Sequence, residues 1–198
     1  MFRLKRFFDL FLSLVFIMVS LPFILLIGFA IKIDSKGPIF FIQKRLGKNC
    51  STFKMYKFRT MIQGAENIGT GHFSYENDPR ITKVGHILRL TSLDELPQIF
   101  NVLIGNMSIV GPRPPVTYEL GPVEDFNDNL KARFRVKPGI TGLAQISGRN
   151  DLTWPEKIKF DNEYIRLLFE KGLILDLKII FKTLFVVLTM SNIVEKEK

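Results

Sequence analysis

Residue types that form crosslinks or bind transition metals are scarce in this sequence. Cys50 is the only cysteine among 198 residues, so an internal disulfide is excluded, and nothing points to an oxidising compartment. The two histidines, His72 and His86, lie fourteen positions apart without companion cysteines, which gives a zinc site little support. No P-loop or dinucleotide-binding fingerprint occurs, which disfavours ATP hydrolysis and hydride transfer. We therefore expect a globular part that lies in the cytoplasm.

Acidic residues are scarce in the first 60 positions, which contain two of them against 11 lysines and arginines. The remaining positions contain 17 residues of each sign, so the whole net charge of +9 arises in the N-terminal part. This part is also the most apolar, and the combination favours an anionic membrane surface as a partner. Nucleic acid is disfavoured because no base-stacking module accompanies the basic residues.

An uncharged stretch of 22 residues runs from Leu10 to Ile31. As a helix it would extend ~33 Å, which is long enough to cross the core of a bilayer. Basic residues flank both of its ends, however, and both ends therefore prefer the cytoplasm. Pro22 removes a backbone donor near the middle and predicts a kink that Ser20 can help to satisfy. The residues leave two paths open, a helix that turns back within the membrane and an ordinary spanning helix with a tolerated proline.

An adjacent acidic pair, Asp94 and Glu95, lies among three arginines, Arg80, Arg89 and Arg113. An aspartate can attack phosphorus as a nucleophile, and a neighbouring glutamate can hold Mg²⁺. Guanidinium groups can brace the phosphate oxygens that do not react. The combination indicates phosphate chemistry.

The same residues also fit the start of a helix. Ser92 followed by Glu95 matches a capping box, although Pro97 would then lie at the fifth helical position and lose a backbone hydrogen bond. A helix that begins nearer Asp94 places Pro97 in its first turn and puts both carboxylates at the positive end of the helix dipole. Capping and catalysis are compatible roles for this segment.

The segment 77–114 resembles the corresponding part of the bacterial sugar transferases, the small monotopic polyprenol-phosphate phosphoglycosyl transferases. The resemblance extends over nearly the whole chain in the order of the family. It includes Gly37-Pro38, Gln43-Lys44-Arg45, residues 56–61, residues 137–145, Gly148-Arg149-Asn150, Trp154 and Asp161.

This resemblance implies an enzyme that moves a sugar-1-phosphate from a UDP-sugar to polyprenyl (undecaprenyl) phosphate and releases UMP. Asp94 would attack the sugar-bearing phosphorus and form a phosphosugar-aspartyl intermediate, and Glu95 together with Asp94 would hold Mg²⁺. Two other functions stay open, a non-catalytic membrane-surface scaffold and a glycosyl transferase that releases UDP. Contacts with phosphate or other parts of the substrate are implied for Lys57, Arg59, Arg80, Arg89, Arg113, Arg149 and Asp161.

For the fold we expect a mainly α protein with a small β-hairpin. The family resemblance implies that residues 1–34 form a re-entrant membrane helix broken at Ser20 and Pro22, although Leu21 here separates the adjacent Ser and Pro of the family. Residues 35–198 are expected to form one compact domain on the cytoplasmic face of the bacterial inner membrane. Apolar surfaces that face the bilayer would also permit a homodimer.

Local patterns predict several elements of this domain. Strands are expected at residues 39–42 and 51–56, joined by a turn, and a rigid turn is expected at residues 111–115. Helical patterns occur at residues 87–90, 96–104 and 156–168. The apolar residues 173–188 predict a further helix, which we expect at the membrane surface.

Overall fold

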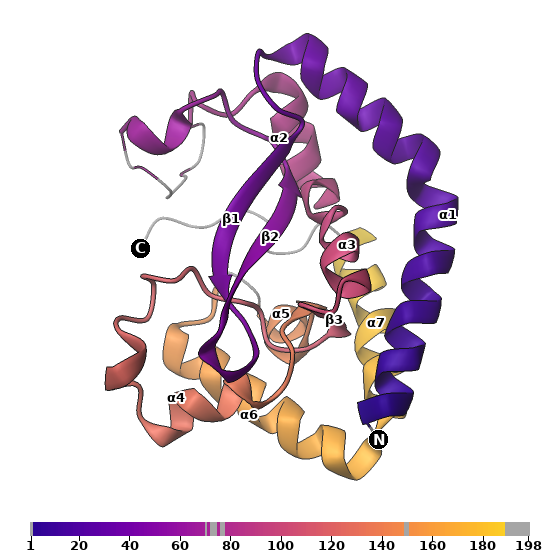
Figure 1. Ribbon diagram of the computed structural model, residues 1–198, viewed down its shortest axis with the longest axis vertical. Coiled ribbons are helices and arrows are strands. Elements are labelled where there is room, and N and C mark those ends of the chain that lie inside the picture. The colour runs from indigo at the N-terminus through magenta and orange to yellow at the C-terminus, as the bar shows by residue number, and fades with distance from the viewer. Residues whose placement is uncertain (1, 70, 72–74, 76–77, 149–150, 189–198) are drawn as a thin grey trace.

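The computed structural model describes residues 2–69, 71, 75, 78–148 and 151–188. A long N-terminal helix runs along one side of a domain that contains a β-hairpin and several shorter helices (Figure 1). The predicted mainly α fold with a small hairpin is therefore confirmed. The helices are α1 (Phe2–Asp34), α2 (Lys83–Leu90), α3 (Gln98–Leu103), α4 (Asp128–Ala132), α5 (Leu143–Ser147), α6 (Trp154–Lys171) and α7 (Leu173–Leu188), and the strands are β1 (Phe40–Leu46), β2 (Thr52–Phe58), β3 (Ser108–Val110) and β4 (Gly139–Thr141).

Helix α1 is continuous, and Pro22 lies inside it. Its axis bends along its length (Figure 1), as expected where a proline removes a donor from the helical ladder. The predicted break is therefore a bend within one helix. The hydroxyl of Ser20 is buried and has no hydrogen-bond partner among the described residues, so in this structure Ser20 does not bind the backbone that Pro22 frees.

The first turns of α1 are attached to the domain by charged side chains. Lys5 forms a buried ion pair with Asp176 of α7. Arg6 donates to the carbonyls of two residues at the end of α3, at 2.6 and 2.8 Å. Asp9 accepts from the Ser108 hydroxyl at 2.8 Å and from the next backbone amide at 3.1 Å. The N-terminal end of α1 is thus part of the folded domain.

The rest of α1 exposes an apolar surface. In the described part of the chain it is the one helix long and apolar enough to cross a membrane, and only 17% of its most apolar window is buried. Phe23, Leu25, Leu26 and Phe29 are each at least 60% exposed. A core helix of a soluble domain would bury such side chains, so this surface fits contact with lipid. The choice between a re-entrant and a spanning path stays a prediction.

Strands β1 and β2 form the predicted antiparallel hairpin, with Phe40 opposite Phe58 and Leu46 opposite Thr52. The hairpin extends from the neighbourhood of α2 to that of α4 and α6 (Figure 1). At its open end, Phe58 packs with residues of α1 and α2, including Ile31. This packing fixes the hairpin across the domain and holds its residues against the cavity described below.

The largest apolar cluster lies among β3, α6 and α7. It contains Val110, Tyr164, Leu168 and Ile179, all almost fully buried. The Tyr164 hydroxyl lies 2.8 Å from a carboxylate oxygen of Asp176, which also binds Lys5. Helix α7 has the predicted bounds. It has two apolar faces, since Leu175 and Ile179 are buried in the core, whereas Ile174, Phe181 and Leu184 are exposed on the outside. Membrane contact by that outer face stays a prediction.

Candidate active site

The acidic pair lies on a short turn between α2 and α3. Ser92 adopts a left-handed conformation, with φ of 57°, and Leu93–Glu95 form a 3-10 turn. Leu93 and Leu96 pack against the cluster between α1 and α2, which leaves Asp94 and Glu95 beside the cavity. The capping interpretation is wrong, since the Ser92 side chain makes no cap hydrogen bond and α3 begins only at Gln98. A dipole effect on the pair from a helix start is not supported.

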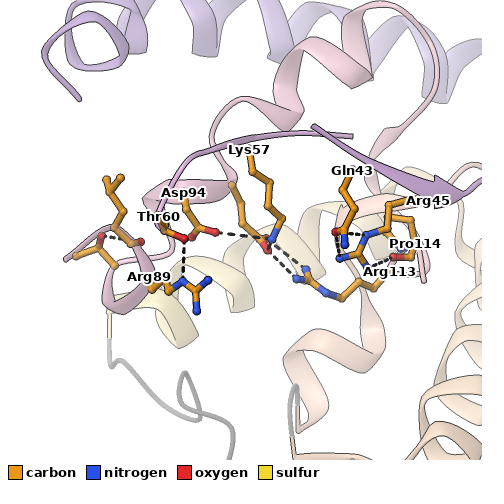
Figure 2. Close-up of polar contacts among 11 residues, drawn as sticks. Gln43, Arg45, Lys57, Thr60, Arg89, Asp94, Arg113 and Pro114 are labelled. Atoms are coloured by element: carbon orange, nitrogen blue, oxygen red, sulfur yellow. Dashed lines mark hydrogen bonds and ion pairs between the residues drawn. The ribbon is translucent and has the colours of Figure 1, made fainter. Parts of the chain in front are cut away.

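Glu95 is held by two cations (Figure 2). Its Oε1 accepts from Lys57 Nζ at 2.8 Å and from Arg113 Nη2 at 2.7 Å, and its Oε2 lies 3.3 Å from Arg113 Nη1. Burial acts to raise the pKa of the Glu95 carboxyl, but Arg113 and Lys57 outweigh it and hold the pKa well below its usual range. Glu95 is therefore a firmly ionised group.

Asp94 has a different environment. Within the described residues its one ion-pair partner is Lys57, whose Nζ lies 3.7 Å from Oδ2. Burial raises the pKa of the Asp94 carboxyl, Lys57 partly offsets this shift, and the charge of Glu95 adds to it. Among the described residues, Asp94 thus has no cation within hydrogen-bond distance, and its pKa is shifted upward where that of Glu95 is shifted downward. These are the properties of the better nucleophile of the two.

Arg89 and Arg113 bring positive charge to either side of the pair. Arg89, in the last turn of α2, donates to the Thr60 hydroxyl at 2.9 Å, and its charge lowers the pKa of Asp94. Arg113 lies in the predicted rigid turn after β3, and its side chain is 44% exposed although it binds Glu95. The predicted residues Lys57, Arg89, Arg113, Asp94 and Glu95 all line one cavity.

This cavity has a volume of about 700 Å³, which suits a ligand as large as a nucleotide sugar. Residues from both strands of the hairpin line it, together with residues from several other elements. Apolar residues, including Phe40, Met61 and Ile62, lie toward α2. Toward α5 and α6 the lining includes Gln145 and Trp154. The acidic pair lies between these ends.

Two predicted arginines bind the protein itself. Arg59 donates to the carbonyls of Ser35 and Lys36 just after α1, at 2.8 and 2.7 Å, although it also lines the cavity. Arg80 is buried, binds Asp78 through Nε and Nη2, and donates to three loop carbonyls through Nη1. The structure does not bring either guanidinium group to the acidic pair. Arg59 lines the cavity, whereas Arg80 is not among the described residues that line it, and the substrate contacts of both stay predictions.

Arg149, the remaining predicted phosphate ligand, lies outside the described residues, as does His72. Asp161 is described and lines the cavity. It forms a buried ion pair with Arg133, at 2.9 Å from Nε and 2.8 Å from Nη2. Burial raises the pKa of Asp161 to about 6, against the opposing effect of the Arg133 charge. The carboxylate of Asp161 is therefore bound to a protein arginine, and its predicted contact with substrate stays a prediction.

Sequence analysis missed Arg133, which links Asp161 to the turn that carries Arg113. Its Nη2 donates to the Arg113 carbonyl at 2.8 Å, and its guanidinium group lies 5.2 Å from the ring centroids of both Phe134 and Trp154. No motif marked Arg133, because its partners are distant in sequence.

The acidic pair fits a magnesium ion that is shared with substrate. The described residues contain no group of three or more histidine, cysteine or acidic side chains that could hold a metal by themselves. Mg²⁺, however, is commonly bound by one or two carboxylates together with substrate phosphates and water. Asp94 and Glu95 supply two such carboxylates beside a cavity that also contains cations suited to phosphate.

Comparison with known proteins places this site in a family. The family model described as bacterial sugar transferase matches residues 1–190. The chain is 42% identical over 197 residues to the exopolysaccharide production protein PSS of Rhizobium leguminosarum bv. phaseoli, covering 96% of this chain and 97% of the relative. It is 40% identical over 194 residues to the exopolysaccharide production protein ExoY of Sinorhizobium fredii, covering 91% of this chain and 83% of the relative.

A longer relative has a more specific name. The chain is 43% identical over 187 residues to the UDP-glucose:undecaprenyl-phosphate glucose-1-phosphate transferase of Escherichia coli, covering 92% of this chain but only 39% of that protein. A sugar transferase that acts on a nucleotide sugar needs a site of this kind, a cavity with carboxylates and cations suited to phosphate groups. This chain belongs to the bacterial sugar transferase family and is a transferase.

Proposed function

We propose that this enzyme transfers a sugar-1-phosphate from a UDP-sugar to polyprenyl phosphate and releases UMP. The observation that carries the proposal is the unequal environment of two adjacent carboxylates beside a nucleotide-sized cavity. Glu95 forms ion pairs with Lys57 at 2.8 Å and Arg113 at 2.7 Å, whereas Asp94 has, among the described residues, one longer ion pair, to Lys57 at 3.7 Å. The printed name of the Escherichia coli relative includes both a UDP-sugar and undecaprenyl phosphate, which supports these substrates.

In the first proposed step, an Asp94 carboxylate oxygen attacks the phosphorus that bears the sugar. A bond forms between Asp94 and phosphorus, and the bond from that phosphorus to the bridging oxygen breaks, so UMP leaves with the electron pair. Arg113 and Arg89 both line the cavity, and Arg113 is partly exposed to solvent. Both stabilise negative charge on the phosphate oxygens. The product is a phosphosugar-aspartyl enzyme.

In the second step, an oxygen of the lipid phosphate attacks the same phosphorus. The bond from phosphorus to Asp94 breaks, which regenerates the carboxylate and yields polyprenyl-diphosphate-sugar. Lys57 lies between the two carboxylates and keeps Asp94 ionised for the next cycle. Mg²⁺ bound at Glu95 and Asp94 would neutralise phosphate charge.

The proposal includes a place for the reaction, the cytoplasmic face of the inner membrane. The exposed apolar surface of α1 would enter the bilayer, and the bend of this helix, which contains Pro22, suits a re-entrant path. The lipid substrate would then reach the cavity laterally, and the soluble UDP-sugar would arrive from the cytoplasm. A glycosylation assay or cysteine labelling at both ends of α1 in intact cells tests this topology.

Nucleotide release is the first experiment. Purified protein with Mg²⁺ and undecaprenyl phosphate is incubated with a panel of UDP-sugars, and the released nucleotide is identified. We expect UMP from one sugar, and, without lipid, a single burst of UMP with a mass increase of one sugar phosphate on the peptide that contains Asp94.

The same experiment separates the alternatives. Release of UDP instead of UMP would show direct glycosyl transfer. No nucleotide release across the panel from folded, lipid-bound protein would favour the non-catalytic scaffold. Turnover with UMP release but without a labelled Asp94 peptide would keep the reaction and refute the covalent mechanism.

A further inference from the structure

The Gln43-Lys44-Arg45 motif lies on β1, and the proposed mechanism gives it no role. Gln43 and Arg45 are two residues apart on one strand, so their side chains share a face, and both line the cavity. Arg45 donates to Gln43 Oε1 through Nε at 3.0 Å and through Nη2 at 2.7 Å. Its Nη1 donates to the Pro114 carbonyl at 3.0 Å, directly after Arg113 (Figure 2).

The backbone next to Arg45 makes further contacts with the same segment. The Leu46 amide donates to the Pro115 carbonyl at 3.0 Å, and Arg45 forms an antiparallel bridge with Val116. The Val116 amide donates to Glu119 Oε2 at 2.8 Å. The end of β1 therefore holds the chain that follows Arg113 through both side-chain and backbone hydrogen bonds.

Arg45 and Arg113 are two neighbouring cations that repel each other. Burial and the charge of Arg113 lower the pKa of Arg45 to about 10, so Arg45 stays protonated at neutral pH and keeps its donors. Gln43 and the Pro114 carbonyl occupy those donors, so Arg45 cannot easily turn away. The repulsion favours the position of the Arg113 guanidinium beside Glu95.

We propose that Arg45 is a positioning residue that aims Arg113 at the acidic pair by holding the Pro114 carbonyl, with Gln43 fixing the orientation of Arg45. This role rests on the proposed function of the site. In this proposal Arg45 acts on the reaction through Arg113, because its Nε, Nη1 and Nη2 each donate to a protein group, Gln43 or the Pro114 carbonyl. Its effect on phosphate transfer should therefore vanish when Arg113 is absent.

A double-mutant cycle tests this coupling. Arg45→Met in the otherwise unchanged protein should lower kcat/KM for the UDP-sugar by roughly 10- to 100-fold, because a misplaced phosphate ligand is costly. In an Arg113→Met background the same substitution should change kcat/KM by less than about twofold. Equal effects of Arg45→Met in both backgrounds would overturn the proposal.

Two further variants separate positioning from charge and folding. Gln43→Leu removes the acceptor that orients Arg45 without changing charge, and should reduce kcat/KM by roughly fivefold. Lys44→Met removes one positive charge from the exposed face of the same strand and should stay within about twofold of the original enzyme. A loss with Lys44→Met equal to that with Arg45→Met would assign the effect to net charge and overturn the proposal.

Amide hydrogen exchange provides a readout that needs no turnover. Arg45→Met should accelerate exchange in a peptide covering residues 113–119, whereas Lys44→Met should leave it unchanged. Unchanged exchange in Arg45→Met would overturn the positioning role even if the original protein released no nucleotide. If no nucleotide is released but exchange is accelerated in Arg45→Met, the positioning role of Arg45 is supported and the proposed function is refuted. The two failures are therefore distinguishable.

Discussion

Two ion pairs of this protein use the same chemical groups in opposite ways. The Arg133–Asp161 pair is buried, with side-chain exposures of 1% and 2%, and Arg133 also holds a backbone carbonyl. The Arg113–Glu95 pair joins a carboxylate that is 15% exposed to a guanidinium that is 44% exposed. We call the first pair closed, because both of its side chains are shielded from solvent, and it stabilises the structure around it. The second leaves a cation available to a ligand, and the neighbouring Asp94 has no direct hydrogen bond to a cation among the described residues.

The comparison shows that pairing arginine with a carboxylate does not itself mark a reactive site. Both pairs line the same cavity, and what distinguishes the pair at the proposed active site is the exposure of its guanidinium group. Arg80 and Asp78 follow the closed pattern, since Arg80 is buried and also binds loop carbonyls. Mutations at the Arg113–Glu95 site should therefore lower activity, whereas mutations in the buried pairs should lower stability.

The largest effect is expected for Asp94→Asn. It preserves the side-chain size but removes the nucleophilic charge, so kcat should fall by at least about a thousandfold. Burial raises the pKa of Asp94, so the loss of its charge should not lower the thermal unfolding midpoint. Nucleotide release and thermal unfolding measure the two effects. Asp125→Asn changes an exposed aspartate and serves as the control; comparable turnover in both variants would refute the nucleophile assignment.

The closed pair should respond in stability. Asp161→Ala leaves Arg133 buried without its carboxylate and is expected to lower the free energy of unfolding by about 3–5 kcal/mol. Glu170→Ala removes the partner of an exposed pair with Arg166 and should cost less than about 1 kcal/mol. Chemical denaturation of both variants measures the difference. Equal stabilities would show that burial does not distinguish the two types of pair.

Glu95→Gln should chiefly affect the metal. The amide keeps a hydrogen-bond acceptor for Lys57 and Arg113 but loses the charge that attracts Mg²⁺. The Mg²⁺ concentration that gives half-maximal activity should rise roughly tenfold or more. Titration of activity with Mg²⁺ tests this expectation, and an unchanged requirement would count against Glu95 as a metal ligand.

The smallest effect concerns pH. The pKa of Asp94 is raised by burial, and Lys57 partly offsets that shift. Lys57→Met removes the offset, so the proton affinity of Asp94 increases and the ionised nucleophile is lost at a higher pH as the solution is acidified. In the pH profile of kcat/KM, the acidic limb should therefore shift to higher pH by about one unit. Lys54→Met, on an exposed position of the same strand, should leave the limb in place.

Local patterns were sufficient to predict much of the fold. The alternation and turn residues of the hairpin, and the continuous apolar pattern of α7, depend on neighbouring residues and agree with the structure. The acidic pair was also found, because Asp94 and Glu95 are adjacent and the cations around them lie in recognisable motifs. Such features require no knowledge of distant partners.

Features that depend on distant contacts were not predictable. Ser92 matched a capping pattern, but packing of Leu93 and Leu96 beside α1 and α2 imposes a left-handed turn instead. A capping box occurs instead at the start of α6, where the Glu156 carboxylate accepts from the Thr153 amide. The sequence did not indicate the backbone carbonyls that Arg59 and Arg80 bind, and Arg133 carried no motif at all.

The attachment of α1 sets a mechanical condition on the reaction. Lys5, Arg6 and Asp9 bind α7, α3 and β3 without an intervening flexible linker, and Phe58 packs against the other half of α1. If the exposed face of α1 sinks into a bilayer, the cavity must follow it as a rigid body. The height of Asp94 above the lipid phosphates is then fixed by how deeply one helix is immersed, so bilayer thickness becomes a variable that can tune turnover.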